Sequence, residues 1–163
     1  MNNQTKALQD IAAPDGVCFG CGANNTQGLR IKSYWDTDGV HVVTTHVPDE
    51  RYVGWPKLVY GGLLSCLIDC HSNWTVMAHH YRAEGREPGT EPRIDCVTGK
   101  LGVKYIKPTP MGVPLLLKAR IEGEVGRKTQ VLCEVYAGDV LVALGDSVFV
   151  RVDVGHLAKT AHS

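Results

Sequence analysis

The sequence predicts an α+β fold in which a long antiparallel β-sheet wraps around one long central helix. Two observations lead to this prediction. Residues 60–80, YGGLLSCLIDCHSNWTVMAHH, open with two glycines and then run for about five helical turns without a proline or a further glycine. The second half of the chain consists of β-branched runs that short turn sequences separate. Because short turns join antiparallel neighbours, the resulting sheet can bury such a helix against its apolar face.

The central helix has one broad apolar arc at 100° per residue. Its polar side carries Asp69, the only carboxylate of the segment. A lone acid in a mostly apolar helix is costly to bury without a partner, so we expect Asp69 at a wet edge or in a functional site. His71 falls near the apolar arc and is expected to be a hydrogen-bonded core histidine. The predicted arc comprises Leu63, Leu64, Leu67, Cys70, Trp74, Met77 and Ala78, and the other side Ser65, Asp69, Ser72, Asn73 and Val76.

Six segments are expected to form strands, and together with the helix they make a single domain at this chain length. Thr37-Asp38-Gly39 is typical of the turn of a hairpin between the first two strands. Residues 1–14 predict a loosely held tail or a short helix, and residues 155–163 predict a C-terminal tail. The predicted strands are residues 29–36, 40–47, 94–106, 115–125, 129–136 and 140–152.

Charge and hydropathy exclude several classes of function. Lysine plus arginine equals aspartate plus glutamate, so no basic stripe predicts nucleic-acid binding. No run of apolar residues is long enough for a membrane span, and the first ten residues do not resemble a signal peptide. We therefore expect a cytoplasmic protein whose six cysteines are reduced thiols.

Cys18 and Cys21 form a CxxC motif in a Gly/Asn-rich stretch that must be a loop. A zinc site would require a second ligand pair at suitable spacing, and the sequence suggests none. A redox motif would be expected to open a helix after a strand, whereas more loop follows here. We interpret the motif as a structural turn, with Cys66 and Cys70 as small core residues, and expect no metal and no cofactor.

Gly61 and Gly62 stand at the start of the central helix, where the first amide groups have no partner within the helix. They fit either a tight loop-to-helix junction or a site for an oxygen that gains negative charge, such as a thioester carbonyl under attack. Asp69 lies seven residues after Gly62, about 10 Å along the helix axis. If the two act together, they must come from different chains, so a functional interpretation predicts a homodimer with shared sites.

Four motifs occur in an order that resembles hotdog-fold thioesterases of the PaaI type: CFGCGANNTQGL, VYGGLLSCLIDCHSNW, LGVKYIKPTPMG and GRKTQVLCEV. The resemblance covers about residues 18–150. It implies a dimer, often paired again into a tetramer, that hydrolyses acyl-CoA thioesters at the subunit interface. The family's helix acid matches Asp69, its oxyanion amide matches Gly62, and its hydroxyl residue on the following strand matches Thr98.

Two positions depart from the family pattern. The histidine that commonly precedes the glycine pair is Tyr60 here, and an asparagine found in some members falls at Gly54. The Tyr60 hydroxyl or the Trp55 indole N–H is a candidate for the second oxyanion donor.

The sequence therefore predicts an acyl-CoA thioesterase in which Asp69 is the general base or the nucleophile. Leu63, Cys66 and Trp55 are candidates to line the acyl pocket. The CoA phosphates would need local cations, for which Lys107, Arg127 and Lys128 are candidates, with ordinary turn charges as the alternative.

Three other functions stay open at this point. The first is a non-catalytic acyl-CoA-binding module on the same fold, and the second is a hotdog hydratase or dehydratase. Asp36 and His41 match the D-x4-H spacing of a hydratase dyad, but they flank a turn between strands, so we interpret the match as a coincidence. The third is a non-enzymatic assembly protein.

Overall fold

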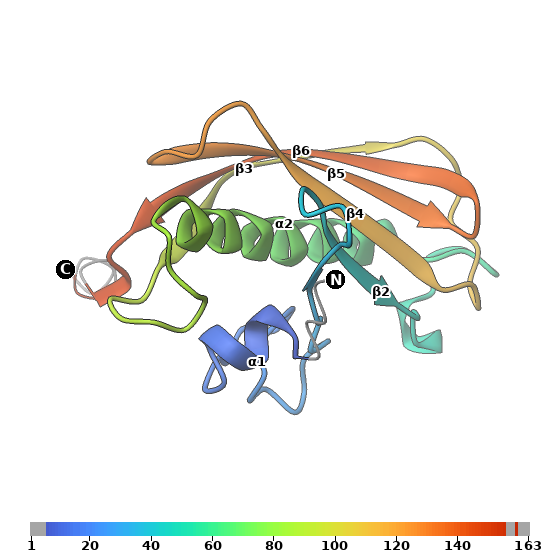
Figure 1. The fold of residues 1–163 in the computed structure, drawn as a ribbon. Coiled ribbons are helices and arrows are strands. Elements are labelled where there is room, and N and C mark those ends of the chain that lie inside the picture. The colour runs from blue at the N-terminus through green and yellow to red at the C-terminus, as the bar shows by residue number, and fades with distance from the viewer. Residues whose placement is uncertain (1–5, 156–158, 160–163) are drawn as a thin grey trace.

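A six-stranded antiparallel sheet curls over one long helix in the computed structural model, which describes residues 6–155 and 159 (Figure 1). The strand order is β1-β2-β4-β5-β6-β3, with every neighbouring pair antiparallel. The predicted α+β architecture is confirmed. The elements are α1 (Leu8–Ala12), β1 (Tyr34–Trp35), β2 (Val42–His46), a 3₁₀ turn (Glu50–Tyr52), α2 (Gly61–Ala83), β3 (Asp95–Tyr105), β4 (Leu115–Glu122), β5 (Lys128–Ala137) and β6 (Val140–Val152).

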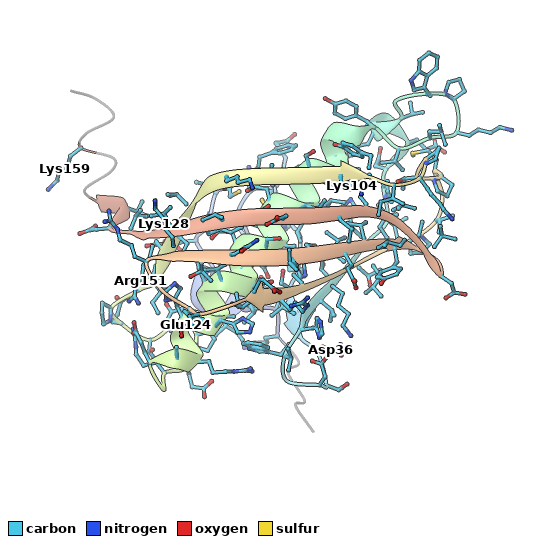
Figure 2. The ribbon with its side chains drawn as sticks, turned by 90° about the horizontal axis from the view of Figure 1, so that it is seen from above. Asp36, Lys104, Glu124, Lys128, Arg151 and Lys159 are labelled. Carbon is cyan, nitrogen blue, oxygen red and sulfur yellow. The ribbon has the colours of Figure 1, made fainter. Side chains whose placement is uncertain are left out.

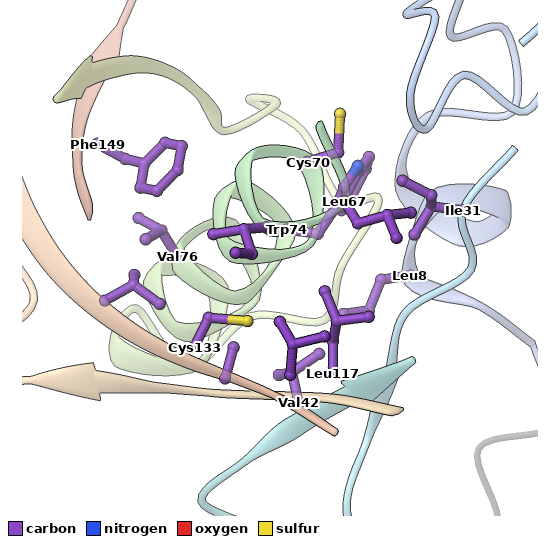
Figure 3. Packing of buried hydrophobic residues seen from close by; sticks show 14 of the residues in the cluster. Leu8, Ile31, Val42, Leu67, Cys70, Trp74, Val76, Leu117, Cys133 and Phe149 are labelled. Atoms are coloured by element: carbon purple, nitrogen blue, oxygen red, sulfur yellow. The ribbon is translucent and has the colours of Figure 1, made fainter. Parts of the chain in front are cut away.

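The central helix α2 is buried on nearly all sides. All seven residues of the predicted apolar arc are buried, but so are Ser72 and Val76, which the sequence placed on the polar side. The sheet curls far enough around the helix to cover that side as well. Figure 3 shows the result, with Phe149 and Cys133 of the sheet on one flank of α2.

The N-terminal segment closes the flank of α2 that the sheet leaves open (Figures 1 and 3). Leu8 of the short helix α1 and Ile31 of the following loop are both buried in the core. The Leu8 amide donates to the Ser33 carbonyl at 2.9 Å, and the Gln9 side chain bonds Ser33 as well. Of the two expectations for residues 1–14, the described part contains the short helix, and residues 1–5 lie outside the described residues.

The strand predicted for residues 29–36 is wrong over most of its length, since only Tyr34–Trp35 form β1. The backbone of this segment bonds the CxxC loop instead of the sheet: Leu29 donates to the Phe19 carbonyl and Ile31 to the Gly20 carbonyl. Arg30 between them has a φ of 53°, which a regular strand does not allow. The other five strands begin and end within three residues of their predicted positions.

His71 is the buried core histidine that the sequence predicts. Its ring is fully buried, with Nδ1 2.9 Å from the Ser33 hydroxyl and Nε2 3.0 Å from the Val42 carbonyl. Burial lowers the pKa of His71 to about 4. The side chain thus ties β2 and the N-terminal segment to α2 in its neutral form.

We expect acid to destabilise the fold through this residue. Below the ordinary pKa of 6.5, the unfolded chain binds a proton at His71 while the folded chain does not. Stability is therefore lost as the pH falls from 6.5 towards about 4, by at most about 3 kcal/mol. Urea unfolding of wild type and His71→Gln at several pH values measures this. The variant should show a shallower pH dependence, and equal slopes would contradict the assignment.

No helix in the described part of the chain is long and apolar enough to cross a membrane. The C-terminal tail predicted for residues 155–163 lies largely outside the described residues.

Candidate active site at the edge strand and the start of the central helix

Asp69 is partly buried on the side of α2 that faces β3. The Thr98 hydroxyl, on β3, donates a hydrogen bond of 2.6 Å to the Asp69 carboxylate. Burial raises the pKa of Asp69 above its ordinary value, while the hydrogen bond from Thr98 opposes that rise. The carboxylate is thus held in one orientation and made more basic than an exposed aspartate.

The strand that carries Thr98 lies at the edge of the sheet. β3 pairs with β6 on one side and with no other strand in the described residues. Its pairing register shifts between Thr98 and Lys100, so Gly99 forms a bulge beside the Asp69 partner. Bulges re-aim side chains and are frequent next to active sites. Residues 97–101 are exposed, including the apolar Val97 and Leu101.

The start of α2 offers free backbone amides. Within the described residues, no acceptor bonds the amides of Gly61 or Gly62, and Tyr60 provides no side-chain cap. The Tyr60 ring lies over Gly62, where an added Cβ would come within 2.5 Å of the Tyr60 hydroxyl oxygen. Glycine at position 62 thus allows the phenol to sit beside the helix terminus. Free amides at a helix start are able to stabilise an oxygen that gains negative charge.

The structure does not bring Asp69 and Gly62 together within one chain. Both lie on the same straight helix, seven residues and about 10 Å apart. A substrate carbonyl at the Gly62 amide is therefore out of reach of the Asp69 carboxylate of the same chain.

Trp55 and Lys107 converge near the start of α2. They line a hollow of about 340 Å³ together with Gly61, and both side chains are exposed. Leu63 and Cys66, the other predicted pocket residues, do not line this hollow. Leu63 is buried in the core, and Cys66 is partly buried next to Cys70.

Arg127 and Lys128 lie elsewhere. Arg127 lines a second hollow with His80 and Glu84 at the C-terminal end of α2, and Lys128 is the exposed first residue of β5 (Figure 2). The three cations predicted to bind phosphate are therefore divided between the two ends of the helix in a single chain.

The D-x4-H match does not form a dyad. His41 Nδ1 pairs with Asp38 at 2.6 Å, while Asp36 pairs with Lys118 at 3.0 Å. Asp36 and His41 thus each pair with another side chain, which agrees with the interpretation of the D-x4-H match as a coincidence.

Two site residues were missed from the sequence. Tyr105, at the end of β3, donates its hydroxyl to the Gly61 carbonyl at 2.7 Å and lies 2.8 Å from the Ser65 hydroxyl. Asn73, one turn after Asp69, donates to the Cys96 carbonyl at 2.9 Å. Together they fasten β3 to α2 on either side of Asp69. Two sequence features could have indicated them. Tyr105 lies within the motif LGVKYIKPTPMG, and Asn73 follows Asp69 by four residues, which is one helical turn.

The CxxC loop, interpreted from the sequence as a structural turn, packs against α2. The Sγ atoms of Cys18, Cys21 and Cys70 all lie within 4.8 Å of one another. The argument that a second ligand pair is lacking did not consider Cys70, which is 52 residues after Cys18 and meets it because the loop folds back onto α2. Hydrogen bonds from Cys21 and then Cys70 lower the pKa of the Cys18 thiol.

A hollow of about 630 Å³ lies on the sheet and is lined by charged side chains such as Lys104, Arg120 and Glu134. Strand alternation places these residues on the face turned away from α2, which Figure 2 views from above. None of the candidate site residues lines this hollow.

Comparison with known proteins identifies the protein superfamily. No protein-family model and no curated protein matches the sequence. Among solved structures, a thioesterase superfamily protein from Shewanella loihica PV-4 is 34% identical, with 76% of this chain and 91% of that chain aligned at a TM-score of 0.61. The chain belongs to this hotdog-fold thioesterase superfamily.

Two more distant structures share the fold. A phenylacetic acid degradation-related protein from Ralstonia eutropha is 20% identical over 76% of this chain and 86% of that chain, with a TM-score of 0.59. A Bacillus halodurans protein solved with CoA is 23% identical over 77% of this chain and 76% of that chain, with a TM-score of 0.58.

Proposed function

We propose that this protein hydrolyses acyl-CoA thioesters at a site that two copies of the chain share. The observation that carries the proposal is the Asp69–Thr98 pair, a basic carboxylate held at an edge strand about 10 Å from the free amides of its own helix. The superfamily membership and the CoA held by the Bacillus halodurans structure support this substrate class.

The edge strand β3 supports a position for the second copy. β3 is 11 residues long, and its outer edge carries unpaired backbone groups and exposed apolar side chains. Pairing with a second β3 about a two-fold axis would continue the sheet and set the two α2 helices antiparallel. Asp69 faces β3, so it would face the partner's helix and reach the amide of the partner's Gly62.

Hydrolysis then follows from the residues present. The thioester carbonyl oxygen accepts from the Gly62 amide of one chain, with the Tyr60 hydroxyl as the second donor. Asp69 of the other chain takes a proton from water, the water oxygen bonds the carbonyl carbon, and the C–S bond breaks. The products are a carboxylic acid and the CoA thiol, which leaves with the proton.

A nucleophilic role for Asp69 gives the same products through an anhydride. Single-turnover hydrolysis in heavy-oxygen water separates the two routes. The label enters the Asp69 carboxylate only if that carboxylate attacks the thioester, and it enters only the acid product if Asp69 is a general base.

The direct test is thiol release from short, long and aromatic acyl-CoAs by the purified protein. We expect turnover with at least one class, and the preferred class defines the acyl specificity. Tight binding of acyl-CoA without any thiol release would instead establish a non-catalytic binding protein.

Cations from both chains would bind the CoA phosphates. In the antiparallel pair, the partner's α2 runs past the N-terminal end of this α2 and Lys107, and its C-terminal end, with the partner's Arg127 beside it, lies beyond them. Neither Lys107 nor Arg127 forms an ion pair with the described residues, so both are available to a phosphate.

We expect Lys107→Ala to raise KM for acyl-CoA about three- to tenfold with little change in kcat, because an exposed charge contributes about 1 kcal/mol. The control substrate is the same acyl group on N-acetylcysteamine, which has no phosphates. Its KM should not change, and an equal rise for both thioesters would exclude phosphate binding by Lys107.

A further inference from the structure

Three thiols from two distant segments meet beside the proposed active site. Cys18 and Cys21 come from the loop before β1, and Cys70 comes from α2. The Sγ atoms of Cys18 and Cys70 are 3.8 Å apart, and all three lie within 4.8 Å of one another. Tetrahedral zinc with Zn–S bonds of about 2.3 Å holds its sulfurs about 3.8 Å apart. A disulfide needs about 2.05 Å and joins only two of the three.

The loop is shaped around these sulfurs. The Gly22 amide donates to the Cys18 carbonyl at 2.8 Å, which closes a tight turn over the motif. This turn directs the amides of Cys21 and Gly20 at the Cys18 sulfur. The Trp74 indole N–H is directed at the Cys21 sulfur. Such N–H donors are the outer-shell groups that orient and stabilise metal-bound ligands.

Gly20 shows how closely the loop lies on the helix. A Cβ at this position would stand 2.2 Å from the Cys70 Sγ and 3.3 Å from the Cys66 Sγ. Only glycine therefore allows the loop backbone to bring its two cysteines onto the helix. Cys66, one turn before Cys70, is hydrogen-bonded to Cys70 and so places a fourth thiol beside one member of the cluster.

We propose that these four cysteines bind one zinc ion as a structural thiolate site that clamps the N-terminal loop onto α2. Cys18, Cys21 and Cys70 are three ligands, and Cys66 supplies the fourth. The pairs have the two- and three-residue spacers that are common for zinc ligands. Binding releases the thiol protons to solvent and changes no oxidation state. The site does not depend on the proposed thioesterase activity.

The test uses the full chain, purified under reducing conditions, loaded with zinc and freed of excess metal. We expect one zinc per chain by elemental analysis. Cobalt in place of zinc should give the visible absorption bands of tetrahedral thiolate coordination. Cys70→Ser should weaken zinc binding more than about 100-fold, since even outer-shell groups contribute 10- to 100-fold. Gly20→Ala should also weaken binding, although it removes no ligand.

Cys96→Ala is the matched control, because Cys96 is buried on β3 outside the cluster and its loss should leave one zinc per chain. Thiol reactivity of the wild-type protein tests the proposal even if a variant does not fold. Zinc should protect the cluster thiols from a thiol reagent, and a chelator should expose them. Absence of stoichiometric zinc, zinc retained by Cys70→Ser, or a disulfide between these cysteines in the native reduced protein would overturn the proposal.

Discussion

Asp69→Asn is expected to lower kcat for acyl-CoA hydrolysis about 10³-fold, within the range that general bases contribute. The amide cannot take a proton from water or attack the thioester, yet it has nearly the same size as the carboxylate. Its oxygen can still accept the Thr98 hydrogen bond, so the fold around β3 should be kept. KM should change little, because Asp69 acts on the reaction rather than on substrate binding.

A matched control for this variant is Asp139→Asn in the exposed turn between β5 and β6. It makes the same chemical change far from α2 and should keep activity within about twofold. Thiol release by Asp69→Asn at a rate near that of wild type would remove Asp69 from the mechanism. Thermal unfolding of both variants checks that any loss of rate is not a loss of folded protein.

Gly62→Val is expected to lower kcat by about 10²-fold, the cost of losing one oxyanion donor. An added Cβ would stand 2.3 Å from the Tyr60 ring, so the ring has to move and the branched side chain covers the helix amides. Tyr60 is exposed, so the displacement should cost little stability. Steady-state kinetics together with a thermal midpoint near that of wild type measures both expectations.

Tyr60→Phe distinguishes the contribution of the Tyr60 hydroxyl to catalysis from that of the Gly62 amide. It removes only the hydroxyl, and we expect a smaller loss than for Gly62→Val if the amide is the main donor. Unchanged kcat in Gly62→Val would place the carbonyl elsewhere and contradict the oxyanion role of the helix start.

The sequence predicted the central helix and most strands because their signals are local. The helix has a broad apolar arc and a glycine pair at its start, and β4, β5 and β6 are joined by short turns. The segment 29–36 has an equally strand-like pattern, but its backbone partners are in the CxxC loop. Local pattern does not encode which distant backbone a segment bonds, and so this strand was overpredicted.

The candidate site likewise combines features that the local sequence predicts with contacts that only the tertiary fold produces. The helical positions of Asp69 and Gly62 followed from periodicity, and Thr98 followed from the family resemblance; the roles of all three stay predictions. The contact of Cys18 and Cys21 with Cys70 could not be predicted, because it depends on how the loop folds back onto α2. The spacers within each cysteine pair are visible in the sequence, but nothing in the sequence shows that tertiary packing brings the loop pair onto the helix pair. Tyr105 was missed for a similar reason, since its role depends on the position of Gly61 across the fold.

The shared site is tested most directly by mixing two inactive variants. Asp69→Asn and Gly62→Val are produced together so that hybrid dimers form. If each site takes its acid from one chain and its amide from the other, a hybrid has one intact site, and statistical mixing should restore about a quarter of wild-type activity. A mixture with no more activity than its separate components would contradict a site built from two chains.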